Sequence, residues 1–460
     1  MQTLDPLHGA AIRMAFALTN GWRPYGRHTA ALERSQWLPW PRIQEIQMRK
    51  LRGLLDHAAR SVPFYRRRFA DAGLRPKDIR TPADLARLPL LSKREIQDHL
   101  SDLLAKGSDR SQLIENHTGG STGQPLTFYQ DAPFVAWAQA DKLRNYRMAG
   151  YRMGMRWAFL WGSDYDASDH KGWRGHLTDR IIYNMVWINT FDLTTSTLLK
   201  AARDLARFRP EMIVAYVSSA TLLARLLRDQ GGVDLRTRSI QTSAEVLTAD
   251  DRALLAETFG CALFDRYGCR EVGNIAHECD AHGGLHLLAE NNLVELLDDA
   301  DRPVPPGQIG RIVVTNLNNR AMPLIRYEIG DLAVASETAC SCGRGLPLLK
   351  TIMGRSADVI TSPSGRLLHG EFFTHLFYKI QGIYQFRVIQ ETHEDLRVQI
   401  VPAPGFDQSA ALSFLERTIH DHGDPAFHLR FEICAHLPTA ASGKYRFTVS
   451  QVPLSFRKEG

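Results

Sequence analysis

The chain has 460 residues, of which 44% are hydrophobic and 23% are charged. This length and mixture are typical of a globular protein with two or more domains, and they exclude a disordered or fibrous chain. Lys and Arg total 56 against 50 for Asp and Glu, and the net charge of +6 is spread without a long basic run, so no nucleic-acid partner is expected. The sequence contains no run of about 18 apolar residues and no secretion pattern at its start, so we expect a cytoplasmic protein with no membrane partner.

The first 105 residues are expected to form a helical lead. Residues 41–59 repeat apolar side chains at helical spacing around a starting Pro41, which is typical of an amphipathic helix. A shorter helix is predicted through Phe69, and Ser92 is placed to cap another one.

From about residue 113 the pattern changes to a strand, a Gly-rich turn and a second strand, followed by a helix near 131–149. Buried strands then alternate with helices, which is the pattern of parallel βαβ units. The strands are predicted at 212–218, 239–245 and 261–268, and the helices at 219–229 and 248–259. Residues 285–335 have the shorter strands and turns of an antiparallel or barrel-like piece.

A polar, Gly-containing stretch at 354–370 indicates a domain boundary. We expect an N-terminal domain over 1–355, and a C-terminal domain over 356–460 with a helix near 407–421. The predicted fold class is α/β, with a large multi-subdomain first domain and a small mobile α+β second domain.

A loop rich in glycine and hydroxyl groups lies between the first two predicted strands. Thr118, Gly119, Gly120, Ser121, Thr122 and Gly123 supply close backbone approach and hydroxyl donors, which suit an anion such as phosphate. It is not a Walker A loop, because no Lys-Ser/Thr pair ends it. Alone, it could equally be a flexible turn.

Five further motifs follow this loop in a fixed order. They are Ser243-Ala244-Glu245, Arg266-Tyr267-Gly268 leading to Glu271, Gly330-Asp331, Gly354-Arg355 leading to Asp358, and Ser442-Gly443-Lys444. In this order, over about residues 44–450, the chain resembles the adenylate-forming acyl-CoA synthetases, in particular the branch of phenylacetate-CoA ligases and capsule-biosynthesis proteins.

The resemblance implies a role for each motif. The 118–123 loop would hold the ATP β- and γ-phosphates, although Gln124 stands where the family often has Lys or Thr. The 243–245 turn and the 266–268 motif would hold adenine, with the Tyr267 ring stacked on the base. Glu271 would bind Mg²⁺ and Asp331 both ribose hydroxyls.

Two motifs are implied to serve the movement and the chemistry. Arg355 lies at the family's hinge and could also contact the nucleotide. Lys444 corresponds to the catalytic lysine of the small domain, whose ammonium can bridge the α-phosphate and the carboxylate oxygen as they are joined. Outside this order Lys444 would be read as an ordinary surface lysine.

Five of the Cys and His residues form a second pattern. Cys279 and His286 with Cys340 and Cys342 would complete a tetrahedral set for a structural Zn²⁺, with His282 as the alternative to His286. The competing interpretation is buried thiols beside surface histidines.

Aromatic residues between 157 and 187 could line a pocket for a flat acid, or they could belong to the core. Trp161 and Tyr216 are the two pocket candidates.

The resemblance therefore implies an AMP-forming acid–thiol ligase. It would activate a small-molecule carboxylic acid, aryl or arylacetic, to an acyl-adenylate with release of pyrophosphate, and then transfer the acyl group to coenzyme A. One alternative is transfer to an amine, another nitrogen nucleophile or a carrier-protein thiol. A more distant one is a catalytically inert nucleotide-binding pathway protein. The identity of the acid, the acceptor and the oligomeric state stay open.

Overall fold

The computed structural model describes residues 22–117, 126–161, 183–190, 195–230, 235–355, 360–365, 379–403, 405–437 and 447–452, together with Asp179, 367–368, 372–373 and 376–377. Within these residues no helix is both long enough and apolar enough to span a bilayer.

The described part of the helical lead, from residue 22, contains the three helices that its sequence predicts and one further helix, α2 (Trp22–Ser35). The predicted helices are α3 (Trp40–Ser61), α4 (Pro63–Asp71) and α5 (Lys93–Asp98), with 3₁₀ turns at Pro76–Asp78, Pro82–Arg87 and Arg110–Gln112. Helix α3 has a proline in its first turn and buries one apolar face that includes Leu51 and Leu54. Ser92 caps α5 by accepting a hydrogen bond from the Glu95 backbone N–H, as expected.

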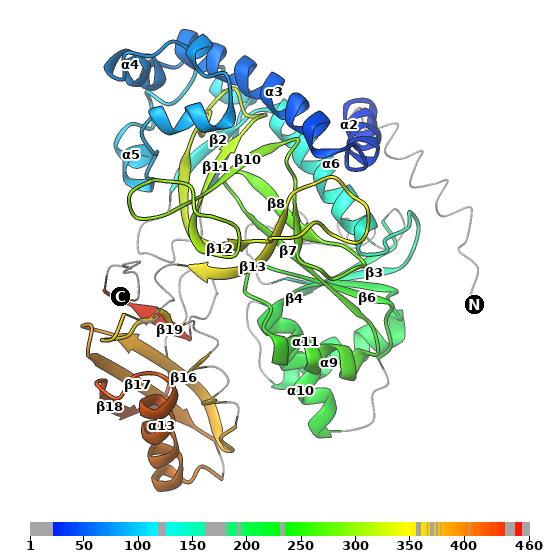
Figure 1. Ribbon diagram of the computed structural model, residues 1–460. Coiled ribbons are helices and arrows are strands. Elements are labelled where there is room, and N and C mark those ends of the chain that lie inside the picture. Colours follow the sequence, from blue (N-terminus) through cyan, green and yellow to red (C-terminus); the bar gives the residue numbers. More distant parts are fainter. Residues whose placement is uncertain are drawn as a thin grey trace.

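An eleven-stranded mixed sheet forms the centre of the large domain (Figure 1). Its parallel half contains β3 (Trp157–Trp161), β4 (Met185–Asn189), β5 (Met212–Tyr216), β6 (Ser239–Ser243) and β7 (Ala262–Cys269), in the spatial order β4-β3-β5-β6-β7. The connecting helices are α9 (Thr195–Phe208), α10 (Val217–Gln230) and α11 (Ala249–Phe259). The predicted βαβ pattern is confirmed.

Side-chain alternation divides the two faces of this parallel half. Ala158 and Ile213 pack with α9, α10 and α11 on one face. Their neighbours Phe159 and Val214 pack on the other face with Tyr146 of α6 (Ala132–Met148). In Figure 1 the three helices lie together on one side of β3 and β6, and α6 lies on the opposite side.

The other half of the sheet is antiparallel and continues directly from β7. Its strands are β8 (Gly273–Glu278), β9 (Leu285–Leu287), β10 (Asn292–Leu297), β11 (Ile309–Asn316), β12 (Tyr327–Ala335) and β13 (Leu348–Arg355), in the order β10-β11-β12-β13-β9-β8. A separate hairpin is made by β1 (Ile114–His117) and β2 (Thr127–Gln130). The helical lead packs against this half, where the buried Tyr65 hydroxyl donates to Pro323 O and accepts from Ile325 N.

A buried ionic network fixes α2 and α6 to the sheet. The Arg144 guanidinium is fully buried and contacts Asp141 Oδ1 and Glu290 Oε1, each at 2.9 Å. Burial alone would raise the pKa of Glu290, but the charge and hydrogen bonds of Arg144 hold it below its ordinary value.

The described residues from 360 onward form a separate α+β unit, which stands apart from the large sheet in Figure 1. Its four-stranded sheet has the order β18 (His428–Ile433), β17 (Asp395–Pro402), β16 (Ile383–Gln390), β19 (Thr448–Ser450). Helix α13 (Gln408–His422) packs on it, and a small hairpin, β14 (Ile360–Thr361) with β15 (Leu367–Leu368), adjoins it. Among the described residues, its hydrophobic core draws only on positions from 360 onward, Phe377 and Val398 among them.

Candidate nucleotide site and metal centre

The candidate pocket residues lie at the carboxyl ends of the parallel strands, the edge at which open α/β sheets bind ligands. Trp161 ends β3, Tyr216 ends β5 and Ser243 ends β6. The Trp161 and Tyr216 rings are in contact, with centroids 4.3 Å apart. The Arg266 guanidinium of β7 lies 6.0 Å from the Trp161 ring centroid.

The Ser243-Ala244-Glu245 turn is held from two sides. Ser243 Oγ accepts from Arg266 Nε at 3.0 Å. The Glu245 carboxylate accepts from the backbone N–H and the hydroxyl of Ser218, in the first turn of α10, at 2.6 and 2.9 Å. Ala244 has φ = 73°, a left-handed conformation that costs energy for a residue with a side chain. The turn is therefore a fixed feature beside the strand ends.

Two tyrosine–carboxylate bonds join the motif at 266–271 to the segment that ends in Gly330-Asp331. The Tyr267 hydroxyl donates to Asp331 Oδ2 at 2.7 Å, and the Tyr327 hydroxyl donates to Glu271 Oε1 at 3.0 Å. The turn after β7 that carries Glu271 is tight, because a Cβ on Gly268 would lie 2.4 Å from the Gly273 carbonyl oxygen. The structure thus brings together residues that the sequence separates by 64 and 56 positions.

Burial and the two carboxylates set the electrostatics of this region. Burial, and then the charge of Asp331, raises the pKa of Tyr267 well above its ordinary value. Burial and the charge of Glu271 act in the same direction on the pKa of Tyr327. Both phenols therefore stay protonated and act as donors. Arg355 Nε lies 3.9 Å from Asp331 Oδ1, which places the predicted hinge arginine beside the predicted ribose ligand.

Two residues of this region, Tyr327 and Lys93, were not predicted from the sequence to belong to the site. Tyr327 stands four positions before Asp331 as Tyr267 stands four before Glu271, a repeated spacing that could have drawn attention to it. Lys93 follows the Ser92 cap, and its pKa is lowered by burial and by the nearby Arg355, against the opposing charge of Glu271.

Several predicted site residues lie outside the described part of the chain. These are the loop 118–123, Asp358 and Lys444. The strands on either side of the loop are described, and they pair as expected: His117 of β1 is opposite Thr127 of β2, with its Nδ1 3.1 Å from Thr127 Oγ1.

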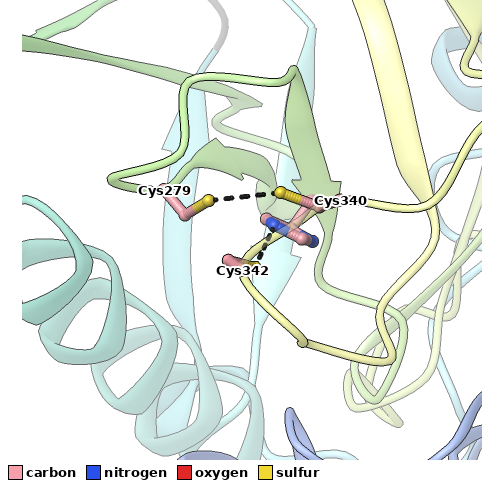
Figure 2. Close-up of side chains that lie close together, drawn as sticks. Cys279, Cys340 and Cys342 are labelled. Atoms are coloured by element: carbon pink, nitrogen blue, oxygen red, sulfur yellow. Dashed lines mark hydrogen bonds between the residues drawn. The ribbon is translucent and has the colours of Figure 1, made fainter.

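The four predicted zinc ligands converge on one point (Figure 2). The ligand atoms of Cys279, His286, Cys340 and Cys342 all lie within 4.8 Å of one another. Cys279 Sγ is 3.6 Å from Cys340 Sγ, and Cys342 Sγ is 3.3 Å from His286 Nε2. The two segments meet because β9 pairs with both β8 and β13, which places the loop before β13 over the end of β8.

The donor set fits Zn²⁺ in number, type and spacing. Ligand atoms about 2.3 Å from a tetrahedral centre lie about 3.7 Å apart, and the contacts of 3.6 Å between Cys279 and Cys340 and 3.3 Å between Cys342 and His286 are close to this distance. Burial lowers the pKa of His286 to about 4, so its imidazole is neutral, as a metal ligand must be. His282 points elsewhere: its Nδ1 lies 3.2 Å from Glu278 Oε1. The geometry therefore selects His286 over His282.

The loop before β13, which carries Cys340 and Cys342, also contacts the helical lead. The Gly345 N–H donates to Gln36 O at 2.9 Å, and the Arg344 guanidinium lies 4.5 Å from the Trp37 ring centroid. A Cβ on Gly345 would lie 1.8 Å from Leu38 O, so only glycine fits this approach.

A pocket of about 560 Å³ opens between α11 and the edge of β9 and β13. Asp265, Glu278, Arg252 and His282 contribute its polar lining. It contains none of the residues predicted to bind nucleotide.

Comparisons with known proteins identify the class. The fold is that of the adenylate-forming ligases: a solved 2-hydroxyisobutyryl-CoA ligase, in the postadenylation state in complex with R3-HIB-AMP, superposes with a TM-score of 0.72 and 19% identity, over 91% of this chain and 92% of that one. A second neighbour is the anthranilate CoA ligase AuaEII in complex with anthranoyl-AMP, with a TM-score of 0.54 and 17% identity over 74% and 66% of the two chains.

Sequence relatives narrow the class to a family. The phenylacetate-coenzyme A ligase of Thermus thermophilus is 30% identical over 331 residues, which are 70% of this chain and 72% of that protein. Protein CapK of Staphylococcus aureus is 22% identical over 89% of each chain. Residues 360–451 match the CapK C-terminal domain. The chain belongs to the phenylacetate-coenzyme A ligase family, and the predicted class, an AMP-forming acid–coenzyme A ligase, is confirmed.

Proposed function

We propose that this protein activates an aryl or arylacetic acid with ATP and transfers the acyl group from the acyl-adenylate to coenzyme A. The family membership supports the reaction class, and the phenylacetate-coenzyme A ligase relatives support this choice of acid. The observation that carries the proposal is a set of contacts between three separate motifs. Tyr267 and Arg355 both lie against Asp331, and Tyr327, four residues before Asp331, bonds to Glu271.

The roles follow from the chemistry of each group. Asp331 is an ionised acceptor suited to a ribose diol, and the Tyr267 ring is suited to stacking on adenine. Glu271 offers the hard carboxylate oxygen that Mg²⁺ prefers, and Mg²⁺ when bound neutralises phosphate charge. Lys444 would stabilise charge on the α-phosphate as the acid attacks, and the 118–123 loop would hold the departing pyrophosphate.

We place the division between the domains at residues 355 and 356. The N-terminal part over 1–355 would bind nucleotide and acid, and the C-terminal part over 356–460 would carry Lys444 and rotate about 356–360 between the two half-reactions. The separate core of the smaller unit and the match to a C-terminal domain model from residue 360 support this division.

We assign a structural Zn²⁺ to Cys279, His286, Cys340 and Cys342. Four protein ligands leave no open coordination position, so the ion would tie the β8–β9 connection to the loop before β13 and take no part in catalysis.

Pyrophosphate release across a library of carboxylic acids tests the activity, with coenzyme A, amines and a carrier-protein thiol as competing acceptors in the second step. We expect release with aryl or arylacetic acids and a thioester with coenzyme A. The amines and the carrier-protein thiol in the panel represent the alternative acceptors that the sequence leaves open. Pyrophosphate release without a coenzyme A thioester would favour one of the other acceptors. No release of pyrophosphate with any acid would indicate an inert nucleotide-binding protein.

A further inference from the structure

The two tyrosine–carboxylate bonds form a crossed pair. Each motif contains a tyrosine followed four residues later by a carboxylate: Tyr267 and Glu271 in one, Tyr327 and Asp331 in the other. Each phenol donates to the carboxylate of the opposite motif, at 2.7 Å for Tyr267 to Asp331 and 3.0 Å for Tyr327 to Glu271. Neither carboxylate is bonded by the tyrosine of its own motif in these two contacts.

Tyr327 is held in a rigid place from which to do this. It is 2% exposed and is the first residue of β12. On either side of it the backbone bonds to Leu91: the Leu91 N–H donates to Arg326 O at 2.8 Å, and the Glu328 N–H donates to Leu91 O at 3.0 Å. Its backbone also pairs with Val314 of β11. A side chain supported in this way can fix a flexible partner.

Glu271 is such a partner, because it lies in the turn between β7 and β8. A carboxylate in a turn can rotate unless hydrogen bonds fix it. The Tyr327 hydroxyl holds its Oε1 with a hydrogen bond of 3.0 Å. Groups that orient a metal-binding carboxylate in this manner typically change metal affinity by about 10–100-fold when removed.

Resting on the function proposed above, we propose that Tyr327 and Tyr267 are positioning residues that hold the Mg²⁺ carboxylate and the ribose carboxylate in fixed register. One nucleotide would then be held at its sugar by Asp331 and at its metal-bound phosphates by Glu271, with the relative placement of the two set by the crossed bonds. Tyr327 contacts no substrate in this arrangement and acts through Glu271.

Isothermal calorimetry of nucleotide binding separates the two phenols without requiring turnover. Tyr327→Phe should lower the apparent affinity for Mg²⁺ in ATP binding by about 10–100-fold. It should leave the affinity for AMP without Mg²⁺ unchanged. Tyr267→Phe keeps the aromatic ring and removes only the bond to Asp331. It should therefore weaken AMP binding through the ribose carboxylate and leave the Mg²⁺ dependence of ATP binding unchanged.

Two controls make the test specific. The Thr392 hydroxyl donates to Asp395 Oδ2 at 2.6 Å outside this site, so Thr392→Val removes another hydroxyl–carboxylate bond and should change neither property. The 2′,3′-dideoxy analogue of AMP lacks the hydroxyls that Asp331 would bind, so Tyr267→Phe should not weaken its binding further.

The outcomes are distinguishable. A folded Tyr327→Phe protein with wild-type Mg²⁺ dependence overturns the proposal for Tyr327. If that variant does not fold, Tyr267→Phe carries the test, and unchanged AMP affinity overturns the crossed register. A wild-type protein that binds ATP in a Mg²⁺-dependent manner but releases no pyrophosphate would refute the ligase function alone, and absence of ATP binding would refute both.

Discussion

Cys342 Sγ lies 3.3 Å from His286 Nε2, although 56 positions separate the two residues in the chain. The contact depends on the sheet order, in which β9 lies between β8 and β13. Of the two candidate histidines, His286 is a buried member of the cluster, and His282 is an exposed partner of Glu278.

The metal centre can be tested by ligand replacement. Cys342→Ser and His286→Ala should abolish stoichiometric zinc in the purified protein and lower its thermal stability, because binding energy to the folded state contributes to folding. His282→Ala and Cys434→Ser are the matched controls and should retain the metal. Elemental analysis with thermal unfolding measures both effects, and full zinc content in His286→Ala would refute the assignment.

The Arg144 network gives a prediction about stability. Arg144→Met should lower the free energy of unfolding by about 3–5 kcal/mol, because it leaves Asp141 and Glu290 buried without their cation. Arg42→Met removes an exposed ion pair to Glu45 and should have little effect. Denaturant unfolding at neutral pH compares them, and equal midpoints would show that the buried network contributes little.

Asp265 predicts a pH dependence of stability. Burial and the adjacent charge of Glu278 raise its pKa from 3.8 to about 7 in the folded protein. The folded state therefore holds a proton that the unfolded state has released between about pH 4 and 7, so stability falls as pH rises through this range. Asp265→Asn should remove this contribution and be more stable than wild type at pH 8, with the difference shrinking toward pH 4. Parallel unfolding profiles for the two proteins would contradict it.

Lys444 predicts a separation of the two half-reactions. Lys444→Ala should abolish carboxylate-dependent pyrophosphate exchange and leave acyl transfer from a preformed acyl-adenylate largely intact, because the ammonium would act on the α-phosphate in the first step. Unchanged exchange would exclude this role.

Local patterns predicted most of the elements, because periodicity and caps act over a few residues. The helix expected near 131–149 is Ala132–Met148, and the helix expected at 248–259 is Ala249–Phe259. Spacing could also suggest the four zinc ligands, since their chemistry restricts the choice to Cys and His. It left His282 and His286 open, because only the fold decides which ring faces the thiols.

The crossed bonds could not be predicted in this way. The repeated four-residue spacing could have drawn attention to Tyr327, but its bond to Glu271 exists only because β12 and the turn after β7 meet in space. The roles of the 118–123 loop and of Lys444 stay predictions based on family order.

The Leu91 contacts with β12 have a consequence for dissecting this protein. One residue, Leu91, bonds to the backbone on both sides of Tyr327, and it lies in the segment before α5, outside the named strands of the sheet. A truncated form that begins after residue 105 would therefore lose part of the support of the candidate nucleotide site along with the helices. A shortened version for engineering should therefore keep at least the segment that contains Leu91.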